Sequence, residues 1–403
     1  MLHQSVSNKQ SRMQLAFMGK FGAWAMMVIF CFMLCCMILG EKLLSPWLFA
    51  RMQQAGDLFY LLLARLHTPP WFSGLLVDGV YRTIGWVLAL LLPPIAVFFL
   101  FVTTLEEAGI FPRGAFSLDE VCRKLGVWGQ QGIGGFLAFG CREAAMKQFQ
   151  KLPPRERFAS VFSCCIVPSC GKFPVILTCL AVIFETVPKP YCSFWKLIVL
   201  CSVLFLCIVV HFGVANLLSR TWLWKMPSWF LLEIPPLCLP QMKTVLYHGV
   251  FRGILPIMGR GCMAALPGGL LLWLMTQFAV GEQSVLEMMV TSLSVPGEYL
   301  GMDGVWLLAF LLGFFSDSLV LPAVLLCQVV CFGENLLLES GADWKMAVCV
   351  LVFTLFHFPC MTDCMAVYKE IGSIGKTVAA MALPTVLGIG CCILLAKIVF
   401  CII

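Results

Sequence analysis

Residues 167–174 read Val-Pro-Ser-Cys-Gly-Lys-Phe-Pro (VPSCGKFP), and they interrupt an apolar run that extends from about Phe158 to Phe184. The two prolines remove backbone donors, and the residues between them place polar groups in a segment that would otherwise be an ordinary transmembrane helix. A second break, His357 to Cys364 (HFPCMTDC), interrupts another apolar run. Irregular backbone at membrane depth requires surrounding protein or a water-filled cavity. Two such breaks therefore predict a substrate path.

The composition places the whole chain in a membrane. Of 403 residues, 61% are hydrophobic and only 12% are charged, and the mean hydropathy is +0.94. These values exclude a soluble globular domain. The net charge of +6 lies in loops beside apolar segments, so it indicates topology and lipid head groups rather than nucleic acid. Most of the 22 cysteines lie inside apolar runs, where a free thiol behaves as a small hydrophobe.

The apolar runs predict an all-α polytopic protein of about eight spans. The N-terminus has basic residues but no clear cleavage site, so we expect a retained first span rather than a signal peptide. Basic residues between Glu106 and Arg157 predict that this region and the N-terminus are cytoplasmic. The expected spans are Trp24–Leu39, Trp86–Val102 with a Pro93-Pro94 kink, the broken Phe158–Phe184, Leu197–Leu218, Cys262–Val280, Val305–Val330, the broken Met346–Val367 and Thr377–Val399. An amphipathic stretch at Leu44–Leu66 is expected to lie along the interface or to pack on the bundle.

An internal repeat relates the two halves of the chain. Pro93, Gly129 and FLAFGCRE (Phe136–Glu143) recur about 175 residues later as Pro267, Gly304 and LLGFFSDS (Leu311–Ser318). Chance similarity between apolar helices is the alternative, and the matched order of several landmarks argues against it. The pattern predicts an N-terminal region (1–84), a first gate repeat (85–220), a cytoplasmic connector (221–260) and a second gate repeat (261–403), with a transport site between the repeats.

Several short motifs occur in a fixed order and together carry a resemblance to a known family. They are PPW (69–71), LVDG (76–79), LEEAGIFPRGAF (105–116), AFGC (138–141), PRER (154–157), VPSCGKFP (167–174), LEIPPLCLPQ (232–241) and HFPCMTDC (357–364). The chain resembles the membrane domain of the ferrous iron transport protein B family, which has two gate repeats similar to nucleoside-recognition domains. The likeness covers nearly the whole chain from the first span onward.

The resemblance also identifies departures from the family pattern. The family normally carries a GTP-binding domain, which this sequence lacks, so a separately encoded GTP-binding partner is expected. Gly375-Lys376-Thr377 looks like the end of a phosphate-binding loop, but Glu370 replaces the required glycine and no strand precedes it. No activated nucleophile or complete nucleotide motif is present, so we predict no enzymatic activity. Ser169 replaces an expected cysteine, and Arg142 replaces an asparagine.

Ferrous iron is bound by thiolate, imidazole and carboxylate groups. The resemblance and the residue types select as candidate metal ligands Cys360, Cys364, Asp363, Cys141, Cys170 and Ser169. Candidates for the transport path are Asp317, Arg142, Pro168, Gly171, Pro359, Thr362 and Glu106. Cys360 and Cys364 would share one helix face if both are helical, with Asp363 beside it. The alternatives are that the thiols only pack against neighbours and that Asp317 forms a buried pair with Arg142.

The sequence favours permeation of Fe²⁺, or another divalent cation, across a bacterial cytoplasmic membrane, with no permanently bound cofactor. Two alternatives stay open: a non-transporting scaffold or regulatory subunit, and a gate-type transporter of another solute such as a nucleoside. A homo-oligomer is also left open. The basic residues from Lys147 to Arg157 are expected to form a solvated face, or a docking surface for the GTP-binding partner.

Overall fold

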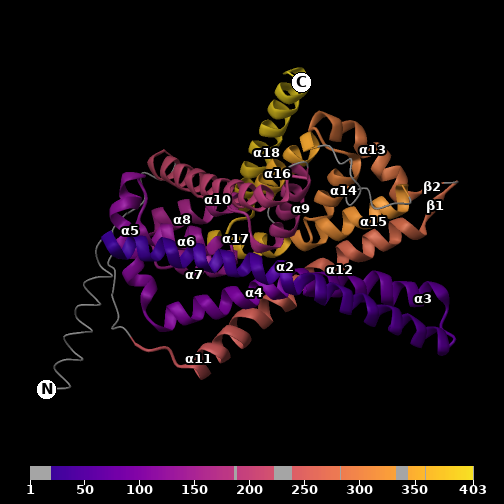
Figure 1. Ribbon diagram of the computed structural model, residues 1–403, viewed down its shortest axis with the longest axis horizontal. Coiled ribbons are helices and arrows are strands. Elements are labelled where there is room, and N and C mark those ends of the chain that lie inside the picture. The colour runs from indigo at the N-terminus through magenta and orange to yellow at the C-terminus, as the bar shows by residue number, and fades with distance from the viewer. Residues whose placement is uncertain are drawn as a thin grey trace.

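A computed structural model describes residues 20–185, 188–221, 238–281, 283–332, 344–358 and 360–402, and these are mostly helical, with short turns and breaks and one small hairpin (Figure 1). In the hairpin, β1 (Ala279–Val280) pairs antiparallel with β2 (Gln283–Ser284). The first-half helices are α2 (Lys20–Arg65), α3 (Pro70–Gly74), η1 (Leu75–Tyr81), α4 (Arg82–Glu107), α5 (Ile110–Lys124), α6 (Gly129–Ala138), α7 (Arg142–Phe149), α8 (Pro154–Ser163), η2 (Cys164–Ile166), η3 (Cys170–Lys172), α9 (Phe173–Ile183) and α10 (Lys189–Arg220). Those of the second half are α11 (Met242–Tyr247), η4 (His248–Ile254), α12 (Leu255–Gln277), α13 (Val285–Tyr299), α14 (Gly304–Leu312), η5 (Asp317–Leu319), α15 (Val320–Phe332), α16 (Trp344–Phe356), α17 (Met361–Ile371) and α18 (Ile374–Ile402).

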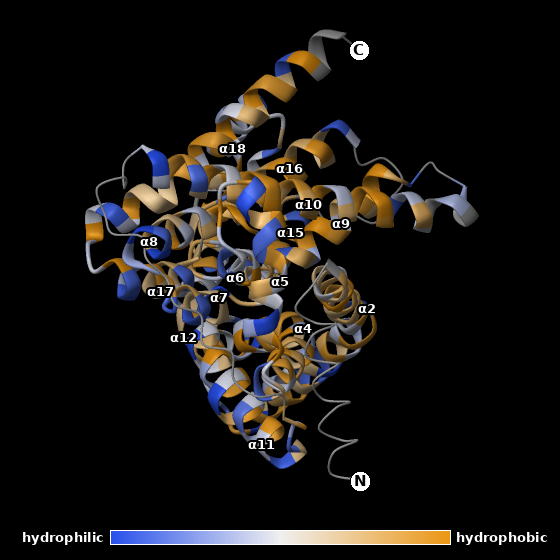
Figure 2. Ribbon diagram, turned by 90° about the vertical axis from the view of Figure 1, so that its left-hand side faces the viewer, coloured by the Kyte–Doolittle hydropathy of each residue, from blue (hydrophilic) through white to orange (hydrophobic). Residues whose placement is uncertain are grey.

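The described helices confirm an all-α polytopic membrane protein. Seven of them, some joined end to end, are long and apolar enough to cross a membrane, and a bent pair brings the number to eight. The outer helices α2, α10 and α18 are largely apolar, whereas hydrophilic residues gather around α7, α8 and α17 (Figure 2). This distribution is expected where outer helices face lipid and inner helices surround a polar path. The cytoplasmic side of the N-terminus stays a prediction, because residues 1–19 lie outside the described part of the chain.

The first helix is longer than the sequence predicts. Residues assigned to a separate interfacial stretch, Leu44–Leu66, continue the first span as one 46-residue helix, α2. A helix of that length extends about 69 Å, more than twice the hydrocarbon thickness of a bilayer. Along this length α2 packs antiparallel against η1 and α4: Gly56 lies against Tyr81 of η1, and Gly85 of α4 lies against Met52. The polar part of α2 therefore packs against other helices instead of forming a separate segment.

The structure supports the internal repeat in backbone detail. A π-helix, η1 or η4, precedes each proline-containing helix α4 and α12. Gly126 and Gly301 both have left-handed backbone, with φ of 77° and 72°. A Cβ added to Gly129 would lie 1.9 Å from the carbonyl oxygen of Ala115, and one on Gly304 would lie 2.1 Å from the equivalent oxygen of Val290. Each repeat therefore uses a glycine to let two helices cross at backbone distance.

The predicted sixth span is wrong as a continuous helix. Residues Val305–Val330 divide into α14 and α15, and Gly313–Ser316 and the 3₁₀ turn η5 separate them. Helix α14 also bends by 102° from α13. The break contains no proline, so its apolar flanks resemble an uninterrupted span. Asp317 consequently lies at a helix break rather than in the middle of a span.

Candidate cation path between the repeats

Four helix breaks meet around one cavity. They separate α6 from α7, α8 from α9, α14 from α15, and α16 from α17. We call this space the inter-repeat cavity; its polar lining comes from all four breaks and from α12, and consists of Cys141, Arg142, Glu143, Ser169, Cys170, Arg260, Ser316, Asp317, Ser318, Cys360, Thr362 and Asp363. It measures about 70 Å³ as space open to the centres of water molecules. A single water needs about 10–15 Å³ on this measure, so a small ion with a few waters fits.

In the first repeat, the break after α6 places a positively charged side chain, that of Arg142, in the cavity. Cys141 has extended backbone, with φ of −154°, and caps α7, which begins at Arg142. The Arg142 side chain is only 1% exposed, and it forms an ion pair with Asp363 from the second repeat. Its second terminal nitrogen donates a 2.9 Å hydrogen bond to the carbonyl oxygen of Val167. Arg142 thus connects three of the four breaks.

In the second repeat, the equivalent break places a carboxylate in the cavity. Ser316 has φ of −157°, like Cys141, and Asp317 follows it. The Ser169 hydroxyl donates a 2.9 Å hydrogen bond to Oδ2 of Asp317, whereas Oδ1 is buried with no hydrogen-bond partner among the described residues. A Cβ on Gly171 would lie 3.0 Å from that of Asp317, so a glycine there lets the two breaks approach closely. The alternative of a buried pair between Asp317 and Arg142 is not observed, and Arg142 pairs with Asp363 instead.

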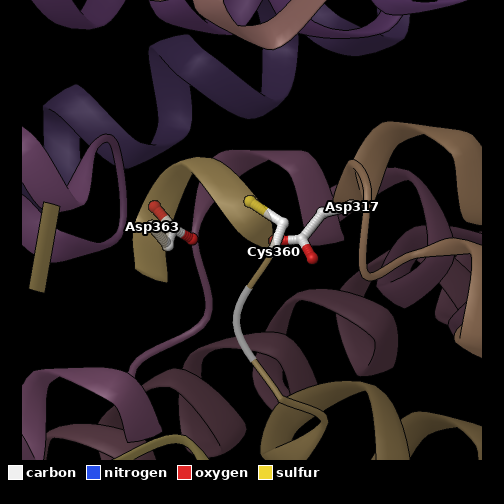
Figure 3. A group of neighbouring side chains, drawn as sticks. All are labelled: Asp317, Cys360 and Asp363. Atoms are coloured by element: carbon white, nitrogen blue, oxygen red, sulfur yellow. The ribbon is translucent and has the colours of Figure 1, made fainter. Parts of the chain in front are cut away.

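Three possible ligand groups lie together at this point. One carboxylate oxygen each of Asp317 and Asp363 and the Cys360 sulfur lie within 4.8 Å of one another, with Cys360 between the two aspartates (Figure 3). The Thr362 hydroxyl lies 3.0 Å from the Cys360 sulfur. Carboxylate oxygen combined with thiolate sulfur suits borderline divalent metals, including Fe²⁺ and Zn²⁺. The unpaired oxygen of Asp317 leaves a buried acceptor for such a cation, so the residues present fit a transient metal site.

Several predicted site residues lie elsewhere or act differently. Cys360 caps α17 with extended backbone, and only Met361 onward is helical. The four-residue spacing therefore does not bring Cys364 to the face of Cys360, and Cys364 does not line the cavity. Glu106 lies in a different pocket, beside Glu107, His248 and Lys147. Thus neither Cys364 nor Glu106 joins the ligand group.

Cys141 and Cys170 line the cavity but lie outside the group of three ligands. Pro168 is buried in the second break without lining the cavity. Pro359 lies outside the described residues. Of the predicted metal ligands, the structure therefore brings together Cys360 and Asp363, and it adds Asp317 from the predicted path.

Lys172 and His357 do not line the cavity, and each contacts a backbone carbonyl oxygen near a helix break. The Lys172 ammonium group is buried and donates a 2.8 Å hydrogen bond to the carbonyl oxygen of His357, so it neither snorkels to an interface nor reaches solvent. The His357 ring nitrogen Nε2 lies 2.8 Å from the carbonyl oxygen of Phe310. Both side chains satisfy backbone groups that the broken helices leave open. His357 is therefore a structural residue, as a histidine among aromatic rings usually is.

Sequence reasoning did not identify Ser316 and Ser318 as cavity residues, nor the Glu143–Arg260 ion pair beside the cavity. The repeat contained the signal for the serines, because Ser316 stands where Cys141 stands in the first half. Sequence reasoning also missed Glu41, which is 4% exposed on α2 and has one oxygen without a hydrogen-bond partner among the residues that the structure describes. The sequence did contain a signal for Glu41, because an acidic residue in a long apolar run marks a candidate functional position.

Comparisons with known proteins confirm the resemblance found in the sequence. Residues 200–252 match the family model described as "Ferrous iron transport protein B C terminus". The chain is 25% identical over 329 residues to the Fe(2+) transporter FeoB of Synechocystis sp. (strain ATCC 27184 / PCC 6803 / Kazusa), covering 79% of this chain and 51% of that protein. It is 23% identical over 333 residues to the Fe(2+) transporter FeoB of Staphylococcus aureus (strain N315), covering 79% and 48%.

A shorter match relates the chain to a Fe(2+) transport protein A/Fe(2+) transporter FeoB fusion protein of Porphyromonas gingivalis (strain ATCC BAA-308 / W83). The two are 26% identical over 179 residues, which cover 44% of this chain and 20% of that protein. The chain spans about half the length of the first relatives named above. No solved structure matches it significantly. The relatives place the likeness in the membrane region that contains the inter-repeat cavity.

Proposed function

We propose that the chain conducts Fe²⁺ across a bacterial cytoplasmic membrane through the inter-repeat cavity. The observation that carries the proposal is the group of Asp317, Cys360 and Asp363, the first two buried and the third half-buried, where the broken helices of both repeats meet. A carboxylate at this depth is costly unless it is paired or binds a cation. Asp317 has one oxygen with no hydrogen-bond partner in the described part of the chain, which is the state expected of a site that binds cargo only in passage.

The ligand chemistry and the relatives both favour iron. Two oxygen ligands and one sulfur ligand form a mixed set, which suits a borderline ion better than Mg²⁺ or Ca²⁺. The relatives that match the chain are named Fe(2+) transporters. A thiol must lose its proton to bind a metal as the thiolate, so a weakly held, exchanging ion rather than a permanent one fits the buried thiol Cys360. We therefore propose that Fe²⁺ is cargo and that the chain holds no permanently bound cofactor.

Flux through the purified chain tests the proposal. The full chain is reconstituted in vesicles that contain a dye quenched by Fe²⁺, with ascorbate to keep the iron reduced. We expect Fe²⁺-dependent quenching above that of protein-free vesicles. Cys360→Ser should lower it by at least about tenfold, since even partners outside the ligand shell change metal affinity by that much. Cys201→Ser, which changes an exposed thiol on α10, is the matched control.

The result that would overturn the proposal is wild-type quenching equal to that of empty vesicles, with and without a GTP-binding protein. It would favour a non-transporting membrane subunit. Flux that Cys360→Ser leaves unchanged would move the path away from the inter-repeat cavity.

We also propose that a GTP-binding protein or domain contacts the segment around Lys147 and Lys151. Both lysines are exposed. Arg155 and Arg157 on the same stretch instead hold Ser219 and Glu370, so only part of the predicted basic face is solvated. Because Gln150 and Arg157 both contact Glu370 on α17, a partner bound here could act on the helix that carries Asp363.

Reversing the exposed charges tests this surface. Lys147→Glu with Lys151→Glu should abolish any stimulation of Fe²⁺ flux by the GTP-binding protein and leave unstimulated flux intact. Lys124→Glu, an exposed charge on α5, is the control. Equal stimulation in the double variant and the control would disprove the contact.

A further inference from the structure

We propose that the Arg142 side chain closes the path. Its guanidinium group forms an ion pair with Asp363, and cargo passes only when that ion pair opens. The inference rests on the proposed function, in that the cargo is taken to be a cation. It adds a gate and names the residue that forms it.

Arg142 connects the two repeats, and we call its ion pair with Asp363 the latch. It begins α7 in the first repeat, whereas Asp363 lies in the first turn of α17 in the second. The same guanidinium donates to Val167 beside Pro168, so one side chain holds three helix breaks in fixed positions. Its side chain has no exposed surface, and its Nε has no partner among the described residues. Opening therefore requires the release of one ion pair and one carbonyl bond.

Charge balance makes Arg142 and cargo competitors. Two cationic side chains, Arg142 and Lys172, are buried near two carboxylates, Asp317 and Asp363, so the closed site carries no net charge. Charges interact strongly at low dielectric, and a divalent cation beside an immobile guanidinium would be repelled. When the guanidinium leaves Asp363, the same position gains a free carboxylate next to Cys360 and Asp317. One movement therefore removes the repulsion and completes the ligand group.

A second ion pair on α17 supplies a matched comparison. Glu370, two turns after Asp363, pairs with Arg157 of α8, so both arginines join the first repeat to the same helix. Arg157 is partly exposed and does not line the inter-repeat cavity. If the loss of any ion pair between the repeats merely loosened the structure, breaking either pair would expose Cys360 equally. A latch predicts that only the Arg142 pair controls access to Cys360.

Thiol labelling of the full chain in detergent tests the latch without any transport. A charged methanethiosulfonate reagent is added, and labelling of Cys360 is followed by peptide mass spectrometry. We expect Cys360, which is 7% exposed, to label slowly in the wild type. Arg142→Gln should label about tenfold faster or more, because the pair that closes the cavity is gone. Asp363→Asn should also label faster, so either variant carries the test if the other fails to fold. Arg157→Gln should label at the wild-type rate.

Two results would overturn the latch: wild-type labelling rates in both Arg142→Gln and Asp363→Asn, or an equal acceleration in Arg157→Gln. The readout separates this inference from the proposed function. Faster labelling of Arg142→Gln in a chain that carries no Fe²⁺ would keep the gate and reject the cargo. Fe²⁺ flux with unchanged labelling would keep the cargo and reject the gate.

Discussion

The first breaks of the two repeats have the same backbone and opposite charge. Cys141 and Ser316 both cap the next helix in extended conformation, with φ of −154° and −157°. The residue that follows is Arg142 in one repeat and Asp317 in the other. Arg142 forms an ion pair across the repeats, whereas Asp317 accepts one hydroxyl hydrogen bond, and its other oxygen has no hydrogen-bond partner within the described segments. The two repeats share one backbone arrangement at this break, and in our proposal the charge that follows it determines whether the break closes the path or binds cargo.

Neutralising Asp363, the partner of Arg142, and neutralising Asp317 should have unequal effects on stability. Asp363→Asn leaves Arg142 buried without a counter-charge, and breaking a buried pair in this way costs about 3–5 kcal/mol. Asp317→Asn removes no close ion pair among the described residues, only the longer-range attraction between Asp317 and buried Lys172, so its cost should be below that. Thermal unfolding in detergent, followed by tryptophan fluorescence, measures both. If Asp317→Asn destabilises the chain as much as Asp363→Asn does, Asp317 is structural and the comparison fails.

The shared backbone can be tested through its glycines. Gly129→Ala and Gly304→Ala each place a Cβ about 2 Å from a carbonyl oxygen, so both should destabilise the chain by similar amounts, about 1–3 kcal/mol. Gly213 on α10 has no atom within 4 Å of such a Cβ, so Gly213→Ala should stabilise it by about 0.5–1 kcal/mol. Unfolding midpoints compare the three. A large cost in one repeat only would show that the two crossings are not equivalent.

Sequence reasoning found the breaks that contain proline and the repeat that relates the halves. It failed where no local signal exists. The break at Gly313–Ser316 has apolar flanks and no proline, so only its match to the first repeat points to it. The Arg142–Asp363 pair joins residues 221 apart, whereas repeat symmetry suggested the pair with Asp317. Cys360 and Cys364 have helical spacing, but the helix begins between them. Long-range pairing and helix starts decide the site, and neither follows from spacing.

The hydrogen bond from Ser169 to Asp317 should have the smallest effect. Ser169→Ala removes a donor to the carboxylate, which is worth about 1 kcal/mol, or about fivefold in metal affinity. The variant also removes a donor that competes with a cation for Asp317. The direction of the change in Co²⁺ affinity therefore distinguishes two roles of the Ser169 hydroxyl. Weaker Co²⁺ binding means that the hydroxyl orients Asp317, and tighter binding means that it competes with cargo. Ser163→Ala, a buried serine outside the cavity, should bind Co²⁺ like the wild type.

The central claim is that Asp317, Cys360 and Asp363 together hold a divalent cation. Optical titration of the full chain with Co²⁺ tests it most directly, because thiolate coordination gives sulfur-to-cobalt absorption in the near ultraviolet. We predict that the band appears in the wild type, persists in Cys364→Ser, and disappears in Cys360→Ser, with saturation at higher Co²⁺ in Asp317→Asn. A band that persists in Cys360→Ser, or that is lost only in Cys364→Ser, would contradict the claim.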